Sequence, residues 1–372
     1  MMSTMTTEQN RLKQVLKCGQ SIWYDGLMGV AELRRMIEED GLRGATTNPT
    51  IFEKAIVSGD YDAELRQFSK SENVEAVYQK LAVQAVQGVA DVFRVVFQET
   101  RGNDGFVSIE VSPLLAYDTQ ATIREGRELW QKVARSNVMI KVPATREGLG
   151  AIETLISEGI NVNVTLIFSI ERYLEVMNSY QAGLERRDRA GKPISGIASV
   201  ASFFVSRVDT AIDKILEEKI KSSCEPDLQS SLKQLLGKAA IANSKVAYAE
   251  FEKVFSSTRF QALESQAAKV QRPLWASTGT KNLNYSDVLY VEALIGPDSV
   301  DTMPPATLAA FKKHGVAVSR IQENLKEATH TLAQLANLGI NLMQVTQTLE
   351  EVGVKAFADS YEGLLKAIQN KR

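Results

Sequence analysis

Residues 138–168 read VMIKVPATREGLGAIETLISEGINVNVTLIF and contain the clearest indication of the fold. The two ends of this stretch are short apolar runs of strand length. Between them lies REGLGAIETLISEG, whose apolar residues recur with a period of about 3.6 residues. A strand, a helix and a second strand in this order form a βαβ unit, in which the two strands lie parallel. The stretch therefore predicts an α/β protein with a parallel sheet.

The same alternation of strand and helix patterns recurs along the rest of the chain. Eight apolar runs of strand length follow one another: SIWYDG from Ser21, GATTNP from Gly44, FVSIEVS from Phe106, NVMIKVPA from Asn137, NVNVTLIF from Asn161, ISGIASVAS from Ile194, PLWAST from Pro273 and SVDTMPP from Ser299. Eight such units favour a closed (β/α)8 barrel, the TIM barrel, and a doubly wound open sheet is the alternative. The eighth run is the least regular, because Pro304 and Pro305 end it quickly.

Two gaps between the predicted strands are longer than a single helix needs. Residues 50–105, between the second and third strands, and residues 208–272, between the sixth and seventh, carry charged segments with helical periodicity. We interpret them as extra helices outside the barrel. Two more helices are predicted after the eighth strand, over about residues 319–338 and 347–370. On the last one, six residues fall near one face, which we interpret as packing: Leu349, Val352, Ala356, Tyr361, Leu364 and Ile368.

The chain shows no sign of a division into separate units. No linker rich in Pro, Gly or Ser interrupts it, and it has no internal repeat or low-complexity tract. We therefore expect a single α/β barrel domain over residues 1–372, with the N-terminal stretch of about 20 residues and the C-terminal helices as extensions.

The composition excludes several classes of function. The 43 Lys and Arg residues against 45 Asp and Glu give a net charge of −2, which argues against a general nucleic-acid surface but allows a small basic pocket. Only two Cys and two His residues are present, so a disulfide framework and a His-rich metal site are not expected. No apolar run approaches the roughly 18 residues of a membrane span. We expect a soluble, cytoplasmic protein that uses Lys, Asp, Glu, Ser, Thr and Asn.

Polar side chains gather at the carboxyl ends of five predicted strands. Successive side chains of a strand point to opposite faces, so Asn163 and Thr165 share one face, as do Thr46 and Asn48. Barrel active sites lie at this end, and polar groups on an inward face cost free energy unless they are paired. The fold would bring six residues to one mouth: Asp25, Asn48, Glu110, Lys141, Asn163 and Thr165. A purely structural ion-pair network is the alternative, but it explains poorly why all of them share one end.

These residue types match a particular chemistry. Burial disfavours an ammonium, so Lys141 at a buried strand end would be available as a neutral amine that adds to a ketone and forms a Schiff base. The Schiff base accepts electrons and permits cleavage of the neighbouring carbon–carbon bond. Two carboxylates in different environments, Glu110 and Asp25, can divide the proton transfers, and Thr165 can orient a water.

Two short motifs predict where a phosphate would bind. SFFVSR places Ser202 at a predicted helix N-cap, with Arg207 in the first turns of that helix. STGTKN follows the seventh strand and places Ser277 and Lys281 in a Gly-containing loop. Helix N-termini and such loops bind anions when a cation lies beside them.

Several of these segments resemble one family. GATTNPTIF, VSIEVSP, residues 138–168, VASFFVSRVD and WASTGTKN are similar to transaldolases of the longer bacterial subgroup, without the isomerase domain fused to some of them. The resemblance implies a (β/α)8 barrel, no metal and no cofactor. It also implies transfer of a dihydroxyacetone unit from sedoheptulose 7-phosphate to glyceraldehyde 3-phosphate in the pentose phosphate pathway.

The resemblance also implies a role for each matched residue. Lys141 is similar to the Schiff-base lysine, Glu110 and Asp25 to the acid/base pair, and Thr165 to the threonine that positions water. The same resemblance implies that Asn48 and Asn163 hold the dihydroxyacetone hydroxyls and that Ser202 and Arg207 bind the phosphate. Ser277 and Lys281 are also assigned to the phosphate, and Thr46 to substrate binding. The loop STGTKN departs from the Ser–Phe–Arg of shorter members, and a lysine lacks the bidentate fork of an arginine.

There are two alternative functions, one an enzyme that uses the same lysine and the other a protein without catalytic activity. A fructose-6-phosphate aldolase of the same barrel family would use the same lysine but release free dihydroxyacetone. A barrel without catalytic activity could bind a sugar phosphate as a regulator, although such a protein has no use for a buried lysine beside two carboxylates. Sugar phosphates are the expected partners, and the sequence leaves a monomer and a homodimer open.

Overall fold

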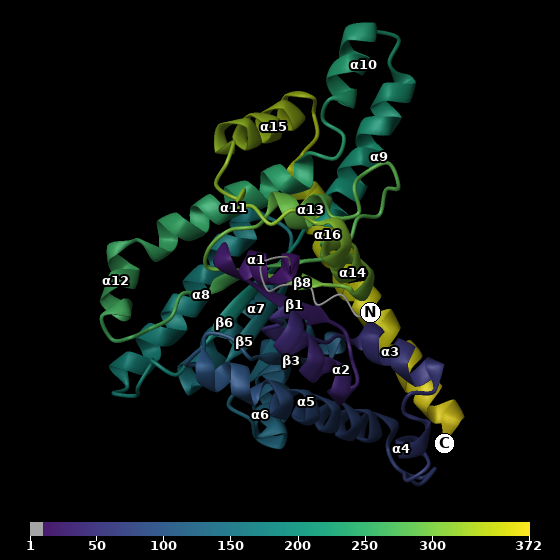
Figure 1. The fold of residues 1–372 in the computed structure, drawn as a ribbon, viewed down its shortest axis with the longest axis vertical. Helices are drawn as coiled ribbons and strands as arrows, with labels where there is room; N and C mark the ends of the chain where they lie inside the picture. Colours follow the sequence, from purple (N-terminus) through teal and green to yellow (C-terminus); the bar gives the residue numbers. More distant parts are fainter. Residues whose placement is uncertain (1–9) are drawn as a thin grey trace, which may run out of the picture.

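A computed structural model describes residues 10–372 and contains a closed parallel barrel (Figure 1). Each strand pairs in parallel with the next, and the first pairs with the last. The eight strands are β1 (Gln20–Asp25), β2 (Gly44–Thr46), β3 (Val107–Glu110), β4 (Val138–Pro143), β5 (Val162–Ile167), β6 (Ser199–Phe204), β7 (Arg272–Ala276) and β8 (Ser299–Met303). The predicted (β/α)8 barrel is confirmed, and the doubly wound sheet is excluded.

Helices surround this barrel, and the extra ones occur where the long gaps predicted them. Those between β1 and β6 are α2 (Val30–Arg35), the π-helix η1 (Met36–Asp40), α3 (Pro49–Ser58), α4 (Asp62–Leu65), α5 (Val74–Glu99), the 3₁₀ helix η2 (Pro113–Leu115), α6 (Thr119–Val133), α7 (Arg146–Glu158) and α8 (Ile170–Arg189). Those after β6 are α9 (Ser206–Ser222), α10 (Pro226–Lys233), α11 (Ala239–Phe255), α12 (Thr258–Glu264), α13 (Leu289–Ala293), α14 (Pro305–His314), α15 (Leu325–Asn337) and α16 (Leu342–Lys371). Ahead of the barrel, α1 (Arg11–Lys17) packs against β1 and α14.

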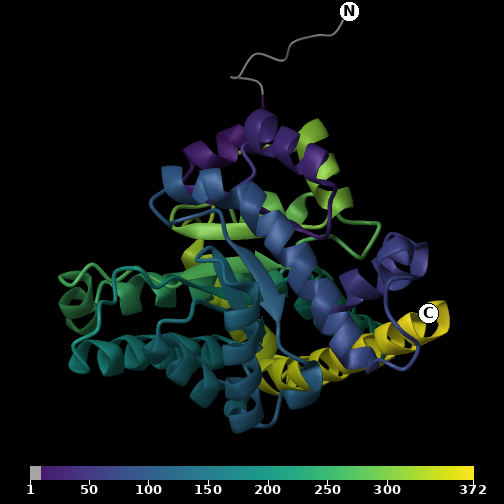
Figure 2. The ribbon, with the colours of Figure 1, turned by 90° about the horizontal axis from the view of Figure 1, so that it is seen from below.

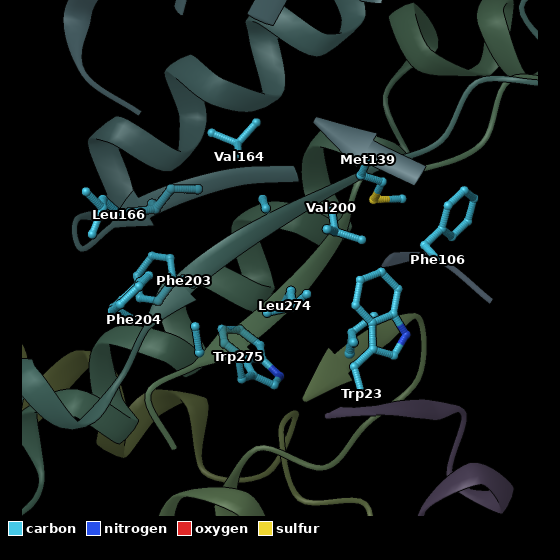
Figure 3. Packing of buried hydrophobic residues seen from close by; sticks show 14 of the residues in the cluster. Trp23, Phe106, Met139, Val164, Leu166, Val200, Phe203, Phe204, Leu274 and Trp275 are labelled. Atoms are coloured by element: carbon cyan, nitrogen blue, oxygen red, sulfur yellow. The ribbon is translucent and has the colours of Figure 1, made fainter. Parts of the chain in front are cut away.

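Large apolar side chains fill the barrel and the layer between strands and helices. Figure 3 shows Trp275 close to Phe203, with ring centroids 6.0 Å apart, and Trp23 close to Phe106 at 6.4 Å. The Trp23 indole leaves no room for a side chain on β2, because a Cβ at Gly44 would lie 2.6 Å from its ring. The glycine at position 44 therefore allows β2 to lie close to β1 beside the Trp23 side chain.

The sixth predicted strand begins later than its apolar pattern indicated. Residues 194–198 form a turn, closed by a hydrogen bond from the Ile197 amide to the Ile194 carbonyl, and β6 starts at Ser199. The strand then continues through Phe203 and Phe204. The prediction that Ser202 caps a helix is consequently wrong, because this residue lies within β6 and α9 begins only at Ser206.

The last helix buries a different face from the one that its apolar residues predicted. Val352 is 55% exposed and Ala356 is also exposed, whereas Phe357 is buried. The buried face includes Thr346, Glu350 and Gly353, which a search for apolar residues passes over; Tyr361, Leu364 and Ile368 are buried as expected. Helix α16 packs mainly against α3 and runs along one side of the molecule (Figure 2).

Candidate active site

A cavity of about 580 Å³ opens at the carboxyl ends of the strands. Strands β1, β2, β4, β5 and β6, the segments after β7 and β8, and helices α3, α9 and α16 all contribute to its wall. Nine of the residues singled out from the sequence line it: Asp25, Thr46, Asn48, Lys141, Thr165, Ser202, Arg207, Ser277 and Lys281. The parallel barrel thus brings residues from distant parts of the chain to one mouth, as the strand pattern predicted.

Lys141 lies at the centre of this arrangement and is only 4% exposed. Its Nζ is 3.2 Å from Glu110 Oε2 and donates a hydrogen bond to the Thr47 carbonyl, also at 3.2 Å. The ion pair follows from the register of the sheet, since Glu110 on β3 is opposite Lys141 on β4. Because parallel partners point to the same face, both side chains reach the barrel interior.

Glu110 lies behind the lysine rather than in the wall of the same cavity. It lines a second cavity of about 520 Å³, bounded by α5, η2, α6 and Tyr361 of α16. Burial raises the pKa of Glu110; the charge of Lys141 opposes this rise, and that of Asp25 adds to it. A carboxyl with a raised pKa binds a proton more readily than an ordinary glutamate does, which suits an acid/base group.

Asp25 ends β1 and lines the same cavity as the lysine. The Thr46 hydroxyl donates to Asp25 Oδ1 at 2.7 Å, and the Thr46 and Thr302 hydroxyls are also 2.7 Å apart. Burial raises the pKa of Asp25, while Lys141, the Thr46 hydrogen bond and Lys54 act against it. The electrostatic field of one amine therefore acts on two carboxyls whose pKa values burial raises.

A hydrogen-bonded group from β3, β5 and β6 supports the floor of the cavity. Asn163 is fully buried; its Nδ2 donates to Ser108 Oγ at 2.8 Å, and its Oδ1 accepts from Ser202 Oγ at 2.7 Å. Asn163 thus lies below the cavity wall, whereas the sequence predicted that it contacts substrate. Thr165, next on the same face of β5, has a buried hydroxyl without a hydrogen-bond partner among the described residues.

The far side of the cavity carries cationic groups. Arg207 is the second residue of α9, half-buried, with its guanidinium 5.4 Å from the Phe204 ring centroid, and burial lowers its pKa. Ser277, in the left-handed region at φ 58°, approaches α9 through its hydroxyl, 2.9 Å from that of Ser206. Lys281 lies further along the same loop and is exposed. The two predicted phosphate motifs therefore meet at one side of the cavity.

Asn48 has a structural contact as well as a place in the cavity wall. Its Oδ1 accepts from the Ile51 amide at 3.0 Å and so caps the N-terminus of α3. This contact fixes the side chain at the junction between β2 and the helix, beside the cavity.

Comparison with known proteins identifies the family. The model of the transaldolase/fructose-6-phosphate aldolase family matches residues 22–368. The chain belongs to this family. It is 43% identical to a transaldolase of Trichodesmium erythraeum (strain IMS101), with 97% of each chain covered. It is 44% identical to the transaldolase of Saccharopolyspora erythraea over 99% of each chain, and 44% identical to that of Thermobifida fusca over 96% of this chain and 97% of the relative.

Lys54 and Phe357 are among the residues of this transaldolase-family chain that line the cavity although the sequence did not single them out. Lys54 on α3 adds a cation near Asp25, and Phe357 on α16 places its ring centroid 5.6 Å from Lys141 Nζ. Both come from helices rather than strand ends. A search confined to polar residues after strands had no means of finding them.

The described part of this family member also lacks two kinds of feature. No group of three or more His, Cys, Asp or Glu side chains within residues 10–372 is arranged to hold a metal ion. No helix in the same range is long and apolar enough to span a membrane.

Proposed function

We propose that this chain is a transaldolase, which transfers a dihydroxyacetone unit from sedoheptulose 7-phosphate to glyceraldehyde 3-phosphate and yields erythrose 4-phosphate and fructose 6-phosphate. The observation that carries this proposal is the buried ion pair of Lys141 with Glu110 beside a cavity whose far side is cationic. The names of its relatives support the same activity. The reaction belongs to the pentose phosphate pathway.

Schiff-base formation is the first half of the proposed mechanism. Lys141 transfers a proton to Glu110, 3.2 Å away, and its neutral amine adds to the ketose carbonyl carbon. Glu110 then returns the proton, through a water held by the unpartnered Thr165 hydroxyl, so that the carbinolamine loses water. The product is a protonated imine on Lys141.

Bond cleavage and transfer form the second half. Asp25 takes the proton of the C4 hydroxyl, the C3–C4 electron pair moves toward the imine nitrogen, and erythrose 4-phosphate leaves. The enamine that remains on Lys141 attacks the aldehyde carbon of glyceraldehyde 3-phosphate, and Asp25 gives its proton to the new hydroxyl. Water then hydrolyses the imine by the reverse of the first half. The raised pKa of Asp25 supports this role, because its conjugate acid persists long enough to return the proton.

The remaining residues are proposed to bind substrate. Asn48 would hold the dihydroxyacetone hydroxyls. Ser202, predicted from the sequence as a phosphate ligand, donates to Asn163, so we assign it instead to the same hydroxyls, with Asn163 acting through this hydrogen bond. Thr46 would act through Asp25. The phosphate would lie at the cationic side, between three residues: Arg207, Ser277 and Lys281. Phosphate groups favour such a combination of helix start, loop and cation.

The alternative activity is that of a fructose-6-phosphate aldolase, which the name of the matched family includes. Such an enzyme releases dihydroxyacetone to water in place of an acceptor aldehyde. We favour transfer because the two carboxyls Glu110 and Asp25 are both present and both have raised pKa values. The relatives compared above are all named transaldolase.

Borohydride trapping tests the proposed chemistry. Reduction in the presence of fructose 6-phosphate should add a dihydroxyacetone-derived mass to the peptide that contains Lys141. An unlabelled Lys141 would overturn the mechanism. Consumption of fructose 6-phosphate should also require an added aldehyde such as erythrose 4-phosphate, whereas equal consumption without it, with accumulation of dihydroxyacetone, would identify an aldolase.

The same proposal extends to partners and location. Small sugar phosphates are the proposed ligands, with no nucleic-acid or membrane partner, and a monomer and a homodimer both stay open. Cys18 and Cys224 are free thiols, which supports a reducing compartment such as the cytoplasm.

A further inference from the structure

Helix α16 is held against the carboxyl end of the barrel by specific contacts. Arg172 at the start of α8 pairs with the buried Glu350 at 3.2 Å. One turn later Gly353 faces the end of β5, where a Cβ would lie 3.1 Å from Leu166 Cδ2. The absence of a side chain at Gly353 therefore allows the helix backbone to approach the strand end closely.

Contacts further along the helix fix its rotation. The Thr50 hydroxyl donates to Ser360 Oγ at 2.9 Å, and the Tyr361 ring meets Tyr78 edge to face with centroids 5.5 Å apart. These contacts come from α3 and α5, whereas Arg172 belongs to α8. Anchored on both sides of Phe357, the helix presents that residue to the barrel.

Phe357 is the only residue of α16 that lines the substrate cavity. It lies one turn after Gly353 on the same face, is 5% exposed, and places its ring centroid 5.6 Å from Lys141 Nζ. Facing it are polar groups of the barrel, including Asp25 and Thr165. The amine is thus enclosed between a polar wall of strands and an aromatic wall from one helix.

An aromatic ring at this position has two effects, one on the water near Nζ and one on a positive charge at Nζ. It offers no hydrogen bond to hold a water, so it displaces solvent from the side of Nζ that it covers. Its π face also attracts a cation, and the protonated imine on Lys141 is one. Neither effect requires the ring to take part in bond making.

We propose that Phe357 is a specificity-determining residue that keeps the enamine for an acceptor aldehyde by excluding bulk solvent from the side of the Lys141 nitrogen that it covers. This inference rests on the proposed transaldolase activity. In the competing release, the Asp25 proton forms a C–H bond at the enamine carbon, water adds to the resulting iminium carbon, and the amine leaves to give free dihydroxyacetone. The ring opposes the first of these steps, because it limits the exchange of protons between solvent and the enamine, whereas hydrolysis of the imine is common to release and transfer.

Two substitutions and a matched control test this role. Phe357→Ala opens space beside Nζ, and Phe357→Leu fills most of it without an aromatic ring. Leu364→Ala is the control, because Leu364 is fully buried on the same helix but does not line the cavity. For each protein, dihydroxyacetone release from fructose 6-phosphate alone and transfer to erythrose 4-phosphate are measured as separate rates.

The expected result is a change in the ratio of the two rates. Phe357→Ala should raise release relative to transfer about tenfold or more, and Phe357→Leu should raise it less, because a buried methylene group or two discriminates by factors of this order. Leu364→Ala should lower the unfolding free energy without changing the ratio. A ratio in Phe357→Ala equal to that of Leu364→Ala overturns the inference, whereas absence of acceptor-dependent transfer in the unaltered protein overturns the proposed function instead.

Discussion

The two ends of the barrel both bury charged side chains, but these side chains have more hydrogen-bond partners at one end than at the other. At the amino end, Asp104 accepts hydrogen bonds from Ser21 at 2.7 Å and Trp23 at 3.2 Å, and Arg272 pairs with it at 2.9 Å. At the carboxyl end, Glu110 Oε2 has no contact other than the ion pair with Lys141 among the described residues.

This difference distinguishes a structural polar network from a reactive one. A carboxylate that accepts hydrogen bonds from several donors is fixed in position, and each donor offsets part of the cost of burying it. A carboxyl with one partner and a raised pKa changes its protonation readily, at a cost in stability. The amino end therefore stabilises the barrel, while the carboxyl end is available for chemistry.

The largest effect is expected at Lys141. Lys141→Ala removes the only group proposed to form a covalent bond with substrate, so turnover should fall by about 10³-fold or more. The barrel should remain folded, as measured by circular dichroism and thermal unfolding. If the variant retained a tenth of the activity, Lys141 would not be the residue that forms the covalent bond with substrate.

At the opposite end, a comparable change should affect stability and not catalysis. Asp104→Ala leaves Arg272 without its carboxylate and should lower the unfolding free energy by about 3 kcal/mol, as measured with denaturant. Turnover per folded molecule should stay within about twofold. Asp359→Ala on the surface is the control and should cost no more than about 0.5 kcal/mol, because its pair with Lys355 is exposed. Equal losses in the two variants would contradict the stabilising role of the amino-end network.

A smaller effect is expected at the phosphate side. Arg207→Ala removes a charge-assisted contact and should raise KM for fructose 6-phosphate about 10- to 100-fold. Unphosphorylated dihydroxyacetone as donor should lose less than about threefold in steady-state assays. Similar losses for both donors would assign Arg207 a role other than phosphate binding.

The last prediction concerns the pH dependence of stability and a buried carboxyl outside both networks. Asp301 accepts from Thr278 at 2.9 Å, and burial raises its pKa to about 8. Since the unfolded pKa is about 3.9, the folded state holds an extra proton between these values, and the unfolding free energy falls as pH rises through this window.

Asp301→Asn removes the titrating carboxyl. The unfolding free energy should then fall less steeply with rising pH, by up to about 1.4 kcal/mol per pH unit between pH 5 and 8. Denaturant unfolding at several pH values measures the slope. An unchanged slope would show that Asp301 is ionised in the folded protein. Asp209, whose pKa burial raises to about 7, contributes a separate fall that the variant retains.

The strands and their polar ends could be predicted because both follow from local pattern. Alternation of side chains is a property of a single strand, and the parallel barrel then brings all carboxyl ends together without further information. Lys141, Asp25 and Thr165 were found in this way. The pairing of Lys141 with Glu110 also follows once the register of two neighbouring strands is known.

The site features that the sequence did not predict depend on contacts between elements that are distant in the chain. Ser202 was assigned to a helix cap because no local signal marks where β6 ends, and Asn163 was placed in the wall although hydrogen bonds to two other strands hold it below. Phe357 was missed because the rotation of α16 is set by Gly353 and Glu350, residues that apolar periodicity does not register.

The contact between the Thr46 and Thr302 hydroxyls has a consequence for the order of events during folding. These residues are 256 positions apart, and they meet only when the first and last strands join. Such long-range closure is among the slowest steps of chain collapse. A partly folded sheet with secondary structure but an open seam would lack the contact of Thr302 with Thr46, the residue that donates to Asp25, so recovery of activity after dilution from denaturant should lag behind recovery of helical signal.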